Sequence, residues 1–116
     1  MKTCMLLLIL PVSIVAQDVV CGGFPPAALG DCLQLINQNV GKLTPAPVEG
    51  SHAVISVGTC AISTQPSPGQ SVTMDYLAKA GNAIYEVCDA PDISGFQGNP
   101  IYSRTCMLES QAFALC

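Results

Sequence analysis

The chain has 116 residues, of which half are hydrophobic, and a formal net charge of −4 with only four lysines and arginines. So few bases argue against nucleic acid and anionic membrane as partners, because both require basic surface patches. One domain of this length buries only a modest core, so cross-links would add substantially to its stability.

The first residues have the layout of a secretory signal peptide. Lys2 supplies the positive charge, residues 4–9 form a short apolar run, and Ala16 ends a segment typical of a cleavage site. The apolar run is too short to span a bilayer, which takes about 20 apolar residues. We therefore expect residues 1–16 to be removed, leaving residues 17–116 as a single secreted, extracellular domain with no transmembrane segment.

Seven cysteines are present, and Cys4 lies in the expected signal peptide. The other six form an even set, which in an oxidising compartment predicts three disulfide bonds. These six are Cys21, Cys32, Cys60, Cys88, Cys106 and Cys116. A zinc site is not expected, because the chain has no C-x-x-C pair and a single histidine. We expect neither a metal nor another cofactor.

Strand and helix signals alternate along the first half of the chain. Residues 17–22 are short and β-branched, which predicts a first strand. Pro26 fits the first position of a helix whose apolar residues recur at three- and four-residue steps as far as Val40, with Gly41 as its stop. The longest β-like run, residues 53–63, is uncharged, so we expect it to be the central strand.

The second half repeats this alternation. Residues 71–74 are long enough for a short strand that returns along the central one. A second helix over residues 76–88 follows, since its apolar residues form one continuous face, and either Thr73 or Asp75 caps its start. Residues 101–109 are predicted to form the last strand.

The resulting order, β-α-β-β-α-β, is that of two split βαβ units. It predicts an α+β fold: a small, disulfide-rich two-layer sandwich with a four-stranded antiparallel sheet and two helices on one face. Six cysteines allow fifteen pairings, so the connectivity is a hypothesis. The pairs that the usual strand order favours are Cys32–Cys60, Cys88–Cys106 and, joining the ends of the domain, Cys21–Cys116.

Two loops are candidate contact regions. Residues 44–52 form the first, and the single histidine, His52, is interpreted as an ordinary exposed residue at its end. Residues 91–100 form the second, which is rich in turn-forming residues and carries Ile93 and Phe96. Ile93 and Phe96 are candidate contacts because of their loop position. For Phe96, packing back onto the core is the favoured expectation and an exposed contact is the alternative.

A combination of motifs resembles a known family. Asp31 and Cys32 open an amphipathic helix, residues 58–60 form a GTC element, an SVTM stretch precedes the second helix, and a TC pair lies in the closing strand. Over roughly residues 31–106 this pattern resembles the necrosis-inducing factor family of fungal secreted cysteine-rich effectors. That family is similar in fold to fungal killer toxins.

The resemblance implies a killer-toxin-like α/β sandwich and a secreted effector or toxin-like protein. Such a protein would act on host or competitor cells by binding a surface component, of unknown identity, or by perturbing a membrane. The resemblance supplies no catalytic residues. It leaves the oligomeric state open.

Two other function classes fit the sequence less well. A non-toxic extracellular carrier of an apolar ligand, as elicitins are, is the alternative, although elicitins are all-helical and residues 53–63 favour a strand. An enzyme is not expected, because a Ser-His-Asp set would require His52 with one of three serines, none in a recognisable motif. Those serines are Ser51, Ser56 and Ser63.

Overall fold

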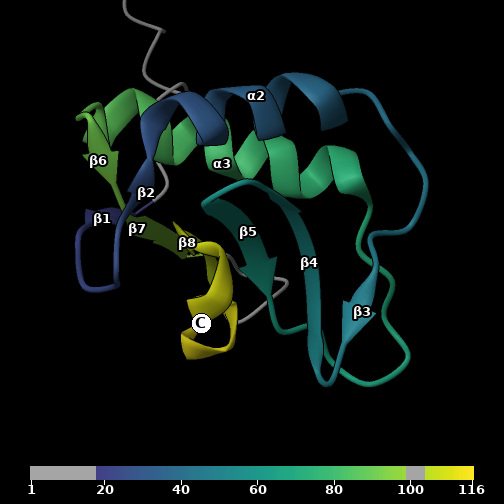
Figure 1. Ribbon diagram of the computed structural model, residues 1–116. Helices are drawn as coiled ribbons and strands as arrows, with labels where there is room; N and C mark the ends of the chain where they lie inside the picture. Colours follow the sequence, from purple (N-terminus) through teal and green to yellow (C-terminus); the bar gives the residue numbers. More distant parts are fainter. Residues whose placement is uncertain (1–17, 99–103) are drawn as a thin grey trace, which may run out of the picture.

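The computed structural model describes residues 18–98 and 104–116 (Figure 1). The expected signal peptide, and residues 101–103 of the predicted last strand, lie outside the described residues. The elements in chain order are β1 (Val19–Cys21), β2 (Ala27–Ala28), α2 (Leu29–Asn39), β3 (Val48–Glu49), β4 (His52–Val57), β5 (Cys60–Thr64), α3 (Met74–Cys88), β6 (Asp92–Ile93), β7 (Gly95–Gly98), β8 (Arg104–Glu109) and the 3-10 helix η2 (Ser110–Leu115).

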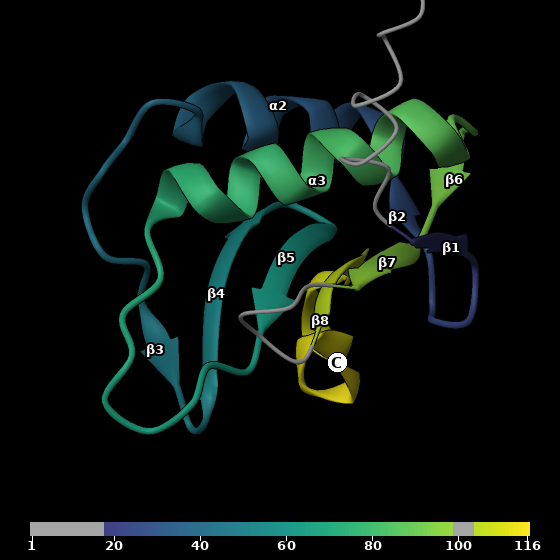
Figure 2. The ribbon, with the colours of Figure 1, turned by 180° about the vertical axis from the view of Figure 1, so that it is seen from behind.

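Six strands form one antiparallel sheet in the order β1-β7-β8-β5-β4-β3, and β2 pairs with β6 beside it. Both α2 and α3 lie across one side of the sheet (Figures 1 and 2). The predicted α+β class with an antiparallel sheet is confirmed. The predicted number of four strands is wrong: residues 53–63 contribute two strands instead of one, residues 71–74 contribute none, and segments taken for loops add β3 and β7.

The predicted central strand is a hairpin. Val57 of β4 pairs with Cys60 of β5, so Gly58 and Thr59 form a two-residue turn. Gly58 has a φ of 56°, in the left-handed region that glycine adopts without strain. A Cβ at this position would also lie 2.5 Å from Oδ2 of Asp31. The run of residues 53–63 therefore reverses direction at its only glycine.

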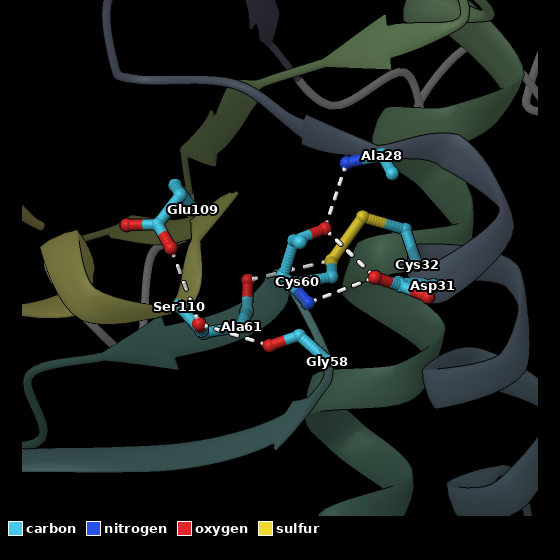
Figure 3. The surroundings of a disulfide bond; sticks show 9 residues. Ala28, Asp31, Cys32, Gly58, Cys60, Ala61, Glu109 and Ser110 are labelled. Atoms are coloured by element: carbon cyan, nitrogen blue, oxygen red, sulfur yellow. Dashed lines mark hydrogen bonds between the residues drawn. A yellow bond between two sulfur atoms is a disulfide. The ribbon is translucent and has the colours of Figure 1, made fainter.

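Asp31 on α2 holds this turn (Figure 3). Its Oδ2 accepts hydrogen bonds from the backbone N–H and from the hydroxyl of Thr59, both at 2.8 Å. The bond from the Thr59 amide is the main reason that the pKa of Asp31 is lowered from its ordinary value, and the hydroxyl adds to it. The next residue in each element, Cys32 and Cys60, forms a disulfide, so α2 is joined to the hairpin twice.

Replacing Asp31 with asparagine keeps the size of the side chain and removes its charge. Because the pKa is lowered in the folded state, the carboxylate stabilises the fold above its unfolded pKa of about 3.9. That stabilisation is lost as the pH falls through the folded-state pKa. We expect Asp31→Asn to melt below the wild type at neutral pH and the difference to shrink below about pH 4. Thermal melts across this range check it, and a difference independent of pH would contradict it.

Two of the predicted boundaries require correction. Pro26 does not start the first helix, because Ala27 and Ala28 pair with β6 and the helix begins at Leu29. Residues 71–74 are not a strand, because Thr73 caps α3 instead, with its Oγ1 accepting from the Tyr76 N–H at 3.0 Å. Thr73 was one of the two residues predicted to cap this helix, so that prediction is confirmed.

All six expected cysteines form disulfides, but only one predicted pair is correct. Cys32–Cys60 is confirmed, and the predicted Cys88–Cys106 and Cys21–Cys116 are wrong. β1 contacts α3, which brings Cys21 to Cys88, and η2 folds back against β8, which brings Cys116 to Cys106. The observed bonds are Cys21–Cys88, Cys32–Cys60 and Cys106–Cys116.

The hydrophobic core lies between the two helices and the sheet. Its centre is formed by fully buried side chains from both layers, among them Leu35, Ile62, Leu77, Ile84 and Met107. On the opposite side of the sheet, η2 contacts β5 and β8. The result is a sandwich with a short C-terminal cover on its second face.

Candidate functional site

A groove opens where β3 and β4 lie next to the C-terminal end of α2. Its volume is about 280 Å³, close to the lower end of typical small-ligand pockets at roughly 300 Å³. The lining combines amide, carboxylate and hydroxyl groups with aliphatic side chains. The lining residues are Gln38, Asn39, Pro47, Glu49, Val54, Ile55, Ser56 and Met74.

The last turn of α2 forms one wall of the groove. Asn39 is held there because its Nδ2 donates to the carbonyl oxygen of Leu35 at 2.8 Å. After the helix, Gly41 reverses the chain with a φ of 86°, as is typical just beyond a helix end. The Gly41 N–H donates to Oδ1 of Asp75 at 2.6 Å, which is also the main cause that lowers the pKa of Asp75. The end of α2 is thereby tied to the start of α3.

Two connecting segments run side by side along this end of the molecule, one from α2 to β3 and the other from β5 to α3 (Figure 2). The Ala46 N–H donates to the Val72 carbonyl at 2.7 Å, and the Met74 N–H donates to the Thr44 carbonyl at 3.0 Å. These bonds join the two connecting segments, so the outer rim of the groove is held in place even though it has little regular secondary structure.

The β3–β4 hairpin forms the other wall, and only two residues of β3 pair with β4. Glu49 pairs with His52, and the Val54 N–H donates to the Pro47 carbonyl at 2.9 Å. Pro47 has no N–H to return a bond to Val54. Strand pairing on this side of β4 ends there, and the exposed Ser56 beyond it faces the groove.

The rim beside the groove is unusually apolar. Val40, Leu43 and Val48 are 50%, 75% and 69% exposed. Six large hydrophobic side chains are exposed in the described ranges, and these three of them lie within the nine residues 40–48. In the sequence, Val40 and Val48 adjoin lining residues of the groove and Leu43 lies in the connection between them, which makes this segment a candidate contact surface. We call the groove together with these three side chains the groove-rim surface.

The predicted contacts in residues 91–100 are not part of this surface. Ile93 is a core residue, 1% exposed, because β6 pairs it with Ala27. Phe96 is half-buried in β7, with its ring centroid 6.1 Å from that of Phe24 and 5.0 Å from the Arg104 guanidinium. The prediction of Ile93 as an exposed contact is therefore wrong, and Phe96 packs within a cluster of its own.

His52 is buried rather than exposed, because it starts β4 and not a loop. Its ring packs edge-on against Phe113 of η2, with centroids 5.6 Å apart. Neither its Nε2 nor the hydroxyl of the buried Ser63 has a hydrogen-bond partner among the described residues. The hydroxyl of Ser51 accepts a bond from Gln65 instead, so no hydrogen bond links His52 to these serines.

Sequence reasoning found part of the groove-rim surface and missed the rest. The candidate loop of residues 44–52 contains Pro47, Val48 and Glu49, which lie on it. The other wall comes from Gln38 and Asn39 of α2, two polar helix residues that no sequence motif marked as part of a site. Their position beside β4 depends on how the helix crosses the sheet, and a local sequence pattern does not predict that crossing.

Chemically, the groove offers a carboxylate, amides, a hydroxyl and a strand edge beside aliphatic surface. This set suits non-covalent recognition of a partner. No group of three histidines, cysteines or acids capable of holding a metal occurs in residues 18–98 and 104–116. In the same ranges no helix is long and apolar enough to cross a bilayer. No family model, curated protein or solved structure matches the chain, so its function must be inferred from this geometry.

Proposed function

We propose that the protein is a secreted fungal effector or toxin-like protein that binds a component of host or competitor cells through the groove-rim surface. The observation that supports this most is the concentration of Val40, Leu43 and Val48 around a groove with polar walls. Exposed apolar side chains next to fixed polar groups are the usual composition of a binding site.

The scaffold suits work outside the cell. Three disulfides each cross-link different elements, and bonds of this kind persist in oxidising compartments. The signal-peptide pattern of residues 1–16 supports the same location. Within the family resemblance, this is the profile of an effector that must survive extracellular proteases.

Binding of a surface is better supported than carriage of an apolar ligand. A carrier needs an enclosed apolar cavity, whereas the described groove is open and lined largely by polar groups such as Gln38 and Glu49. The helix–sheet interface is filled closely enough that a Cβ on Gly81 would lie 2.4 Å from Cδ1 of Ile62. The core itself therefore offers no room for a ligand at that point.

The proposal is tested by binding of the oxidised, fluorescently labelled protein to plant protoplasts and to cells of competitor fungi. The double variant Leu43→Asp/Val48→Asp places two charges on the apolar rim and should reduce binding at least tenfold. Its matched control is Val87→Asp, because Val87 is 60% exposed and lies about 20 Å from Met74 along α3.

The control variant should bind as the wild type does. Ion leakage from the same cells shows whether binding has a toxic consequence. Equal binding by the double variant and the control, or no binding by any form of the protein, would contradict the proposal.

A further inference from the structure

Beyond β3, the outer side of β4 has backbone groups that no described strand pairs with. In an antiparallel pair, alternate residues direct both their N–H and their C=O to the same neighbour. Val57 and Cys60 close the β4–β5 turn, whereas the Val54 N–H points the other way, to Pro47. Two residues further on, Ser56 therefore directs its N–H and C=O away from β5, where no described strand lies.

Val54 adds a third group on the same side that no described residue pairs with. Its N–H is bonded to Pro47, but its carbonyl faces a residue that has no N–H. Ser56 is exposed and lines the groove, so this short stretch of strand edge is reachable from solvent. Proteins that bind peptides by adding a strand to a sheet use unpaired edges of this kind.

The charge of the groove indicates what the added strand must carry. Glu49 is the only ionised side chain in the lining, it is exposed, and no cation pairs with it in the described residues. We propose that the groove binds an extended peptide segment of a partner protein, which pairs with Ser56 as an added strand and places a lysine or arginine toward Glu49. This inference rests on the proposed function and names the class of its target.

A second copy of this chain fits the edge less well. Pairing two copies through β4 would bring two acidic chains together, each with eight acids against three lysines and arginines once the expected signal peptide is removed. Self-association is accordingly an outcome that would count against the proposal.

The probe is a phage-displayed library of random seven-residue peptides, selected on the immobilised, oxidised protein. Ser56→Pro removes the outward N–H and places a ring where the added strand would pair, and an edge strand tolerates proline at such a position. Ser56→Ala is the matched control, because it keeps the N–H. Selected peptides should contain β-branched residues with one lysine or arginine, and should lose at least tenfold in affinity for Ser56→Pro and little for Ser56→Ala.

A second variant keeps the test decisive even if Ser56→Pro folds poorly. Glu49→Lys should reverse the selection, so that peptides with aspartate or glutamate replace the basic ones. In NMR spectra the Ser56 amide of the wild type should shift and gain protection from exchange when a selected peptide binds.

Three outcomes would overturn the inference: no enriched peptide, equal binding to both Ser56 variants, or a dimer of the free protein that uses β4. If Leu43→Asp/Val48→Asp abolishes binding to cells but Ser56→Pro does not, the proposed function stands and strand addition fails. If neither variant affects binding to cells while peptides still bind at Ser56, the edge binds peptides and the proposed function fails.

Discussion

A protein in which Cys32 and Cys60 are both replaced by alanine should lose about 4 kcal/mol of unfolding free energy. The bond closes a stretch of 28 residues between α2 and β5, and the loss of that constraint alone is worth about 3.5 kcal/mol. Both cysteines are fully buried, so the small gap left behind adds to the loss. For a domain with a total stability of about 5–15 kcal/mol, this is a large fraction.

The matched variant is Cys106→Ala/Cys116→Ala. That bond spans only 10 residues and joins η2 to a single strand, so its removal should cost about 2.5 kcal/mol. Guanidinium unfolding followed by circular dichroism compares the two. If the C-terminal bond proved the more costly, the idea that Cys32–Cys60 is the main link between helix and hairpin would be wrong.

Gly81→Val should destabilise the fold by about 3 kcal/mol through overpacking. Gly81 lies on the buried face of α3, where an added Cβ would be 2.4 Å from Cδ1 of Ile62 and 3.4 Å from Cγ1 of Ile36. Valine adds two further carbons to that space. Ile62 is fully buried under the same helix, so its Cδ1 can move only by displacing other closely packed core side chains.

Gly30→Val on α2 is the control, because nothing lies within 4 Å of a Cβ at that position. It should change stability by well under about 1 kcal/mol, since valine is only a few tenths of a kcal/mol more favourable than glycine in a helix interior. Ile62→Val removes Cδ1 and should recover part of the loss in the Gly81→Val background. A double-mutant cycle measures that recovery, and strict additivity of the two changes would contradict the packing argument.

The fold class followed from periodicity, but the hairpin did not. Residues 53–63 are apolar on both sides of Gly58, because β4 and β5 are both inner strands covered by the helices. A run this rich in β-branched apolar residues hides a turn that needs only one glycine and one threonine. The turn is specified by Asp31, which lies 28 residues from Thr59 in the sequence and is invisible to any local window.

The disulfide pairs show the same limit. Cys32–Cys60 was predictable because a helix and the strand after it pack together in most arrangements of this kind. Cys21–Cys88 depends on β1 being an edge strand next to α3, and Cys106–Cys116 depends on η2 folding back over β8. Both are consequences of sheet order, which the spacing of cysteines does not encode.

Only the part of the groove-rim surface that comes from one continuous stretch of sequence was predictable. Residues 44–52 were predicted as a loop and a candidate contact region, which includes part of the rim. Ser56 was predicted only as a residue of the central strand. Its free edge results from Pro47, which ends β3 after two residues. Conversely, Ile93 looked like a loop residue because the two-residue strand β6 is too short to leave a pattern.

The most direct test of the account is hydrogen exchange of the oxidised protein, measured by mass spectrometry with and without isolated surface fractions of the cells it binds. The account predicts protection in peptides that cover residues 40–58 and little change in the second half of α3. Protection confined to α3 around Val87, with residues 40–58 unchanged, would contradict it.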